Sequence, residues 1–230
     1  MKTLINAFPS ALSHVNNYKN DDEEDDKMML PIQAACWNHR GNSIPFIPLL
    51  AVEGMERNIG GEGQRGGLLA EDDGANVLHF LAGHVSSAHD SMCLDVLKRL
   101  RQSDLFKKED IRDYNLLHLS CQPSAKERFE YLVDWDPKAL KEYQYTGEPF
   151  LHDIIIDEGS CAIVFGIALR AGMKHYPGEL GFLFGKNDAG KTACELAFEH
   201  YDKDEAWGKI EECFEETHDV KMVEWNPVTN

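Results

Sequence analysis

Residues 185–198, GKNDAGKTACELAF, fit two different structural patterns. Gly185 followed by Gly190, Lys191 and Thr192 gives GxxxxGK[ST], the pattern of a phosphate-binding loop whose amides and lysine surround a nucleotide's phosphates. Alternatively, the glycine shapes a turn and TACELAF begins a short helix that packs through its small and apolar residues. A short helix of this kind recurs in helical repeat proteins. The choice therefore depends on whether the rest of the chain contains copies.

The short segment recurs along the chain. Its five forms are LPIQAAC, NVLHFLA, NLLHLSC, PFLHDII and TACELAF, with Gln33, His79, His118, His152 and Glu195 at the fourth position. These positions are 34 to 46 residues apart, as in two-helix repeats with variable loops. A segment with helical apolar spacing follows each copy, for example Cys93, Val96, Leu97 and Leu100. The sequence predicts about five helix-turn-helix units.

The fold class follows from the same pattern. Runs of β-branched residues are nearly absent outside residues 154–156, so we expect an all-α protein with residues 30–218 as its repeat domain. Residues 1–29 are predicted to be a partial repeat, because FPSAL at 8–12 resembles DPKAL at 136–140. Six adjacent carboxylates at 21–26 repel one another and predict a solvated acidic loop. Residues 219–230 are expected to be a polar tail.

TACELAF, NLLHLSC and LPIQAAC resemble divergent ankyrin repeats, and with WDPKAL and GLLAEDDG the chain is similar to the algal-type ankyrin-like repeat family. The complete TPLHxA pattern is absent: Pro31 occupies the expected place, Pro149 lies one place early, and Thr192 is the threonine that survives. The resemblance implies a solenoid of stacked helix pairs that binds another protein as an adaptor or scaffold. It carries over no catalytic residue and no cofactor.

Composition restricts the kind of partner. The 230 residues carry a formal charge of -17, with 40 acidic and 23 basic side chains, which argues against nucleic acid and anionic membranes. We expect a partner protein with a basic or amphipathic surface. No apolar run suits a signal peptide or a membrane helix, so a cytoplasmic or nuclear location is expected. The six cysteines lie in apolar segments and are expected to be reduced.

The resemblance also implies where partner contacts lie. In such repeats they come from the turn before the first helix of each unit, and the corresponding residues are Asp72, Asp73, Arg112, Asp113, Tyr143, Tyr145, Asn187 and Asp188. Because carboxylates are frequent in these turns, binding is expected to weaken with salt.

Three other patterns suggest chemistry. The phosphate-loop alternative, with Gly185, Gly190, Lys191 and Thr192 as nucleotide ligands, needs a preceding strand, for which residues 179–184 are the candidate. GGEGQRGG at 60–67 contains GxGxxG but lies between helical segments, so a flexible loop is the better interpretation. His118 and Cys121 could form a metal or catalytic pair, but equivalent histidines one repeat apart cannot converge on one ion. We therefore expect no metal site and no enzyme activity.

Overall fold

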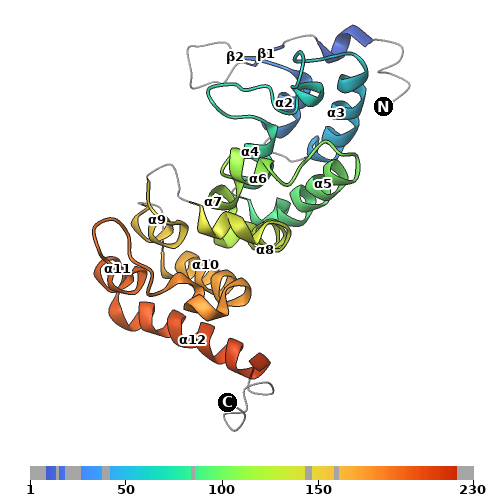
Figure 1. The fold of residues 1–230 in the computed structure, drawn as a ribbon. Coiled ribbons are helices and arrows are strands. Elements are labelled where there is room, and N and C mark those ends of the chain that lie inside the picture. Colours follow the sequence, from blue (N-terminus) through green and yellow to red (C-terminus); the bar gives the residue numbers. More distant parts are fainter. Residues whose placement is uncertain are drawn as a thin grey trace. The chain divides into compact units, whose positions relative to one another are not determined.

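The computed structural model describes residues 9–13, 16–18, 27–37, 42–83, 86–142, 147–157 and 161–221. These residues are mostly helical, which confirms the all-α prediction. They form two compact units, Met1–Ser120 and Cys121–Asn230 (Figure 1). The boundary falls between helices that the sequence pattern assigned to one helix-turn-helix copy. The acidic run at 21–26 and the predicted contact residues Tyr143 and Tyr145 lie outside the described residues.

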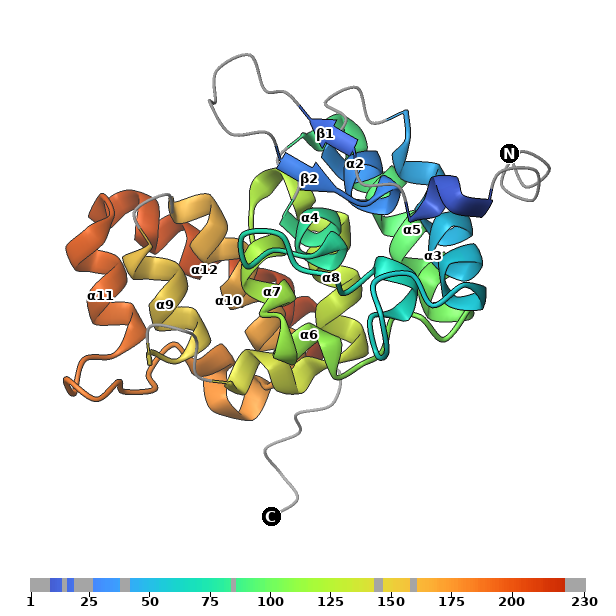
Figure 2. The same cartoon turned by 90° about the horizontal axis from the view of Figure 1, so that it is seen from above.

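The first unit alternates short and long helices. Its elements are η1 (Pro9–Leu12), β1 (Asn16–Tyr18), β2 (Lys27–Met29), α2 (Pro31–Trp37), η2 (Ile44–Phe46), α3 (Ile47–Glu56), η3 (Arg65–Gly67), α4 (Val77–Gly83), η4 (Ser87–His89), α5 (Asp90–Gln102), α6 (Asp110–Asp113) and α7 (Leu116–Ser120). Helices α2 and α3 pack as a pair, as do α4 and α5. In addition α2 packs on α4, α4 on α7, and α3 on α5. The short helices therefore form one layer and the longer helices a second (Figure 2).

The second unit has the same organisation. Its elements are η5 (Pro123–Ala125), α8 (Lys126–Trp135), η6 (Pro137–Lys141), α9 (Phe150–Ile156), α10 (Ala162–His175), η7 (Pro177–Phe182), α11 (Ala193–His200) and α12 (Lys203–Lys221). The short helices α9 and α11 pack on each other, while α10 packs on both α8 and α12. The pairs are α9 with α10 and α11 with α12. Each unit is thus a stack of helix pairs.

The buried residues are those that the helical spacing predicted. In α5, Cys93, Val96, Leu97 and Leu100 are at most 1% exposed. The equivalent stripe of α10 is also buried, at Val164, Ile167, Ala168 and Ala171. In α3 the stripe is shorter than predicted, because Met55 is 50% exposed. Amphipathic spacing accordingly places each long helix with one face in the core.

Short 3-10 turns precede the first helix of several pairs. The segments FPSAL and DPKAL, which are alike in sequence, contain the 3-10 turns η1 and η6, and Leu12 and Leu140 are buried there. η1 packs on α2 and η6 packs on α9. Two similar sequences therefore have equivalent places in the two units.

A glycine contact joins two of the long helices to the turns that follow them. Gly54 of α3 lies against Gly66 of η3, and Gly172 of α10 lies against Gly181 of η7, each so closely that a Cβ would meet backbone atoms. Gly66 and Gly181 have φ values of 69° and 60°, which favour glycine. The flexible loop predicted at 60–67 is therefore wrong for its last residues, which are a packed turn.

Three local features differ from the sequence interpretation. Strands β1 and β2 pair antiparallel with Asn16 opposite Met29, a small hairpin that the sequence did not predict. Residues 154–156, the strongest strand candidate, lie in α9, and most of residues 179–184 lie in the 3-10 turn η7. Helix α12 continues to Lys221, into the segment predicted as tail, because no proline occurs before Pro227.

Candidate binding turns and the residues that anchor them

In three of its five copies, the residue at the aligned fourth position of the short segment anchors the start of its helix. Gln33, His79 and Glu195 are each the third residue of their helices, and each accepts a hydrogen bond from the backbone N–H three residues earlier. The donor–acceptor distances are 2.7 Å from Leu30, 3.0 Å from Asn76 and 2.8 Å from Thr192. The first N–H groups of a helix lack intrahelical partners, so these side chains satisfy a donor that would otherwise be unbonded. At these three residues the side chain at the aligned position therefore bonds to the backbone of its own helix start.

At Thr192 the anchor is a complete capping box. The Thr192 hydroxyl accepts a hydrogen bond from the Glu195 amide at 3.1 Å, while the Glu195 carboxylate accepts from the Thr192 amide. The Glu195 carboxylate accepts hydrogen bonds from the Thr192 amide and from the Thr192 hydroxyl. These two bonds lower the pKa of Glu195, because they stabilise its charged form. Asn76 has the equivalent role in α4, where its side-chain oxygen accepts from the amides of Leu78 and His79.

The same position also contacts the turn of the next helix pair. Gln33 donates through Nε2 to the carbonyl oxygen of Ala70 at 3.0 Å. His152 Nε2 lies 3.1 Å from the carbonyl oxygen of Lys191, which can only accept, so Nε2 carries the proton. His79 meets the ring of Tyr114 edge-on, with centroids 5.6 Å apart. These contacts hold each turn in place against the preceding helix.

His152 shows what one sequence departure costs. It is 1% exposed, and its Nδ1 has no hydrogen-bond partner. The residue three places earlier is Pro149, which is the N-cap of α9 and has no N–H to donate. Because of the proline, the buried acceptor His152 Nδ1 has no donor, whereas the equivalent acceptors on Gln33 and His79 each receive a backbone hydrogen bond.

Two of the predicted turns are short hairpins. Asp72 and Ala75 exchange backbone hydrogen bonds of 2.8 and 3.0 Å around Asp73 and Gly74, whose φ values are 50° and 76°. Positive φ at both central residues is typical of a type I′ turn. Asp73 and Gly74 are exposed at the tip. The turn chemistry predicted at Gly74 is confirmed.

The second hairpin is formed by the stretch that also matches the phosphate-loop pattern. Asn187 donates to the carbonyl of Lys191 at 3.0 Å, and Gly190, with φ of 79°, donates back to Asn187 at 2.9 Å. The Lys191 amide donates to Asn187 Oδ1 at 3.0 Å, and its Nζ pairs with Glu199 at 2.5 Å.

This geometry opposes nucleotide binding. A phosphate loop needs free amides, a free lysine and a free hydroxyl. Here the amides of Gly190 and Lys191 donate to Asn187, and the Thr192 amide donates to the Glu195 carboxylate of α11. The Thr192 hydroxyl belongs to the capping box. A 3-10 turn precedes Gly185 in place of a strand. The stretch forms a turn and a helix start.

Four of the predicted contact residues are exposed, and the role of the whole set in binding stays a prediction. Asp73, Arg112 and Asp113 are exposed in unit 1, as is Asp188 in unit 2, while Asp72 and Asn187 are half-buried. The structure adds two residues that the spacing did not indicate. Tyr114 follows Asp113, and Glu71 precedes Asp72 on an exposed position.

Electrostatics place these added residues near one another. The pKa of Tyr114 is raised, first by burial and then by Asp110; Arg65 opposes this shift, and Glu71 and Asp113 add smaller increases. The pKa of His79 is lowered by burial, and Glu71 opposes that shift. The turns before α4 and α7 thus contribute carboxylates around one histidine–tyrosine contact.

An ion pair fixes the turn that carries Arg112 and Asp113. Asp110 is 2% exposed and accepts hydrogen bonds from Arg65 Nη1 at 2.5 Å and from the Lys107 amide at 2.7 Å. Arg65 also donates to the carbonyl of Leu105 at 3.1 Å. Arg65 belongs to the glycine-rich segment at 60–67, so this segment contacts α6 through the Arg65–Asp110 ion pair.

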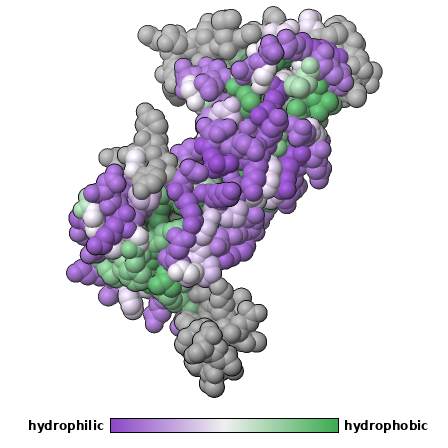
Figure 3. All heavy atoms as spheres, in the orientation of Figure 1, coloured by the Kyte–Doolittle hydropathy of each residue, from purple (hydrophilic) through white to green (hydrophobic). Residues whose placement is uncertain are grey.

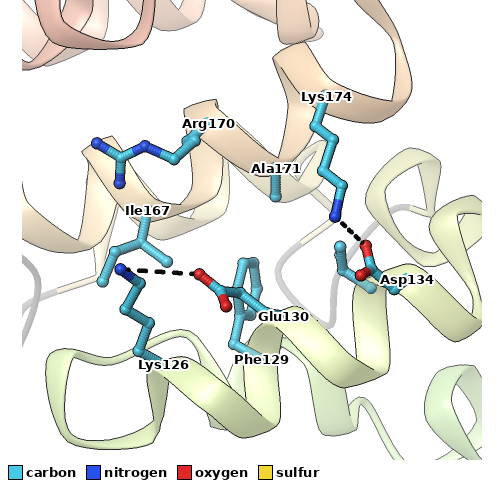
Figure 4. Close-up of a pocket in the computed structure, with 9 residues that line it drawn as sticks. Lys126, Phe129, Glu130, Asp134, Ile167, Arg170, Ala171 and Lys174 are labelled. Atoms are coloured by element: carbon cyan, nitrogen blue, oxygen red, sulfur yellow. Dashed lines mark hydrogen bonds and ion pairs between the residues drawn. The ribbon is translucent and has the colours of Figure 1, made fainter. Parts of the chain in front are cut away.

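In unit 2 a small hollow lies between α8 and α10 (Figure 4). Its lining residues are Lys126, Phe129, Glu130, Val133, Asp134, Ile167, Arg170, Ala171 and Lys174. Lys126 pairs with Glu130 at 3.8 Å and Lys174 with Asp134 at 2.7 Å. The volume is about 70 Å³, far below the roughly 300 Å³ at which metabolite pockets begin. This hollow is a seam between helices.

A wider depression of about 700 Å³ lies beside α5 in unit 1. Its lining combines apolar side chains with the charged residues Asp95, Lys98 and Arg99, and it includes no histidine or cysteine. It therefore lacks the nucleophile and imidazole base that a hydrolase of the Cys–His kind would need.

The remaining chemical candidates find no support in the geometry. Burial raises the pKa of the Cys121 thiol, the opposite of what an activated thiolate requires. Among the described residues, no group of His, Cys, Asp and Glu side chains is arranged to hold a metal ion. Within the same ranges, no helix combines the length and apolar character needed to cross a membrane. Comparison with known protein families, curated proteins and solved structures finds no match to this chain.

Proposed function

We propose that this chain is a divergent ankyrin-like repeat array whose turns bind another protein. The observation that carries the proposal is the recurrent role of the third helix residue. Gln33, His79 and Glu195 each bond the amide of their own N-cap, and Gln33 and His152 also bond the turn of the following pair. Within each unit, these side chains fix the turns against the helix that precedes them. Fixed turns of this kind contribute to the binding surface of repeat arrays.

The chemistry of the turns supports a basic partner. Glu71, Asp73 and Asp113 are exposed in unit 1, and Asp188 is exposed at the hairpin tip of unit 2. With the formal charge of -17 for the whole chain, these carboxylates favour fast association with a cationic surface. The proposed role is that of an adaptor or scaffold, which binds and performs no reaction.

The test compares two variants with equal charge changes. Asp73→Asn with Asp113→Asn removes two turn carboxylates, and asparagine retains the positive φ at position 73. Glu62→Gln with Asp95→Asn removes two exposed carboxylates elsewhere. Each purified protein is photocrosslinked in native cell extract at low and high salt, and captured proteins are quantified by mass spectrometry.

We expect the unaltered chain to capture proteins with basic surfaces. This capture should be lost with the turn variant and at high salt, and it should be retained with the control variant. Equal capture by the turn and control variants would place the binding elsewhere, and capture that resists high salt would exclude a charge-driven turn surface.

A further inference from the structure

Helix α12 exposes a large aromatic side chain. Trp207 is 55% exposed, and the ring of Phe198 from α11 stacks beside it with centroids 6.4 Å apart. Figure 3 shows apolar surface where α11 and α12 lie. Within the described residues α12 is the last helix, so no later described helix packs on this face. An exposed aromatic pair there indicates an interaction surface.

The position of Trp207 within its helix shows how a partner would meet it. Trp207 is the fifth residue of α12, and Gly166 is the fifth residue of α10. At Gly166 the next helix packs directly: a Cβ there would lie 3.0 Å from Lys209 Cδ, and the Cys213 thiol donates to the Gly166 carbonyl at 3.6 Å. The fifth position therefore faces the following helix. On α12 that place holds an exposed tryptophan.

The ninth position of these helices carries an ion pair to the next helix. In α8 it is Asp134, which bonds Lys174 at 2.7 Å and His175 at 2.9 Å on α10 (Figure 4). In α10 it is Arg170, which bonds Glu216 of α12. Each ninth residue thus meets an opposite charge from the thirteenth or fourteenth residue of the following helix.

In α12 the ninth residue is Glu211, an exposed carboxylate with no ion pair in the described part of the chain. Asp204 and Glu215 are also exposed, and with Glu211 they follow the i, i+7, i+11 spacing of one helix stripe beside Trp207. By analogy with the ion pairs of Asp134 and Arg170, the group that pairs with Glu211 would be a cation. A second copy of this chain is a poor source, since it carries -17 and its own α12 is acidic.

We infer that the outer face of α12, formed by Trp207, Glu211, Asp204 and Glu215 with Phe198 behind them, docks a basic amphipathic helix of another protein. The apolar stripe of that helix covers Trp207, and a lysine or arginine meets Glu211, as Lys174 meets Asp134 and Arg170 meets Glu216. This surface is separate from the turns, so it neither requires nor tests the turn proposal.

The probe is a fluorescein-labelled peptide of leucine and lysine with its leucines in helical spacing. A leucine–glutamate peptide of the same spacing and a scrambled leucine–lysine peptide are its controls. Binding to the full chain is measured by fluorescence anisotropy. Trp207→Ala and Glu211→Lys are the test variants. Phe46→Ala, which removes a 40% exposed aromatic ring, and Glu62→Lys, which makes the same charge change, are the matched controls.

We expect the leucine–lysine peptide alone to bind, and each test variant to weaken it about tenfold, with both controls within about twofold of the unaltered chain. Replacing one lysine of the peptide by glutamate should restore binding to Glu211→Lys. Circular dichroism confirms that each variant is folded. The turn variant Asp73→Asn with Asp113→Asn should bind the peptide normally.

Three results would overturn the inference. Equal weakening by Glu62→Lys and Glu211→Lys would show a general charge effect, and normal binding by Trp207→Ala would exclude the aromatic anchor. A dimer in sedimentation velocity that Trp207→Ala dissociates would assign the face to a second copy.

Discussion

Helix glycines in the second unit have opposite structural roles, and alanine substitution should reveal this as opposite signs. Gly172 lies in α10 against the turn η7, and a Cβ on it would be 2.7 Å from the Gly181 oxygen and 2.9 Å from the Gly181 Cα. Gly181 is buried with φ of 60°, so the turn cannot move away through a side-chain rotation. Gly208 lies in α12, and a Cβ there would meet no atom within 4 Å.

The magnitudes decide the sign at each position. Alanine in a helix interior is favoured over glycine by about 1 kcal/mol. Gly208→Ala should therefore raise the free energy of unfolding by about 1 kcal/mol or slightly less. At Gly172 the same gain is opposed by overpacking against backbone, which costs about 1–3 kcal/mol in well-packed sites. Because neither neighbouring atom belongs to a flexible side chain, we place the cost at the upper end. Gly172→Ala should lower the free energy of unfolding by about 1–2 kcal/mol.

The assay is equilibrium unfolding in urea followed by far-ultraviolet circular dichroism and by tryptophan fluorescence. Gly54→Ala provides the corresponding measurement in unit 1, where the Gly66 backbone is the neighbour. If Gly172→Ala and Gly208→Ala shift the urea midpoint in the same direction by similar amounts, the close approach of α10 to η7 is absent and the reasoning fails.

Three other substitutions test the anchors of the turns. Thr192→Ala should lower the free energy of unfolding by about 1 kcal/mol, because it removes the N-cap of α11, whereas Thr192→Ser should retain it in thermal unfolding. Pro149→Thr should raise the free energy of unfolding by about 1 kcal/mol, because threonine supplies a helix cap and an N–H for His152 Nδ1, which outweigh the roughly 0.4–1 kcal/mol lost in chain entropy. The backbone at this position, with φ of -59° and ψ of 146°, already suits a cap. An unchanged or lower urea midpoint would contradict this prediction. Burial lowers the pKa of His79 below its ordinary value of 6.5, so the contribution of neutral His79 to stability is complete above pH 6.5 and is lost as the pH falls through the lower native pKa. His79→Gln, which copies Gln33, should make the urea midpoint depend less on pH below 6.5. If the pH dependence is unchanged, His79 does not contribute to it.

Periodicity and turn chemistry predicted much of the local structure. The all-α class, the buried stripes of α5 and α10, and the turns at Gly74 and Gly190 follow from the order of apolar residues and from the need for positive φ. FPSAL and DPKAL, which are alike in sequence, both contain 3-10 turns. These features depend on residues that are close to one another in the sequence, so they can be predicted from a single sequence.

What the tertiary structure decided involves residues distant in the sequence. The pattern GxxxxGK[ST] could not show that its amides and lysine are already bonded, because Lys191 pairs with Glu199 only once α11 has formed. The order of residues did not reveal that Gly66 packs on α3, nor that Arg65 reaches Asp110 across 45 residues. The aligned position marked Gln33, His79 and His152 as equivalent, but their hydrogen bonds to the next turn depend on how the helix pairs stack. Local spacing specifies the helices and turns, whereas the use of each polar group depends on which partner the fold brings within bonding distance.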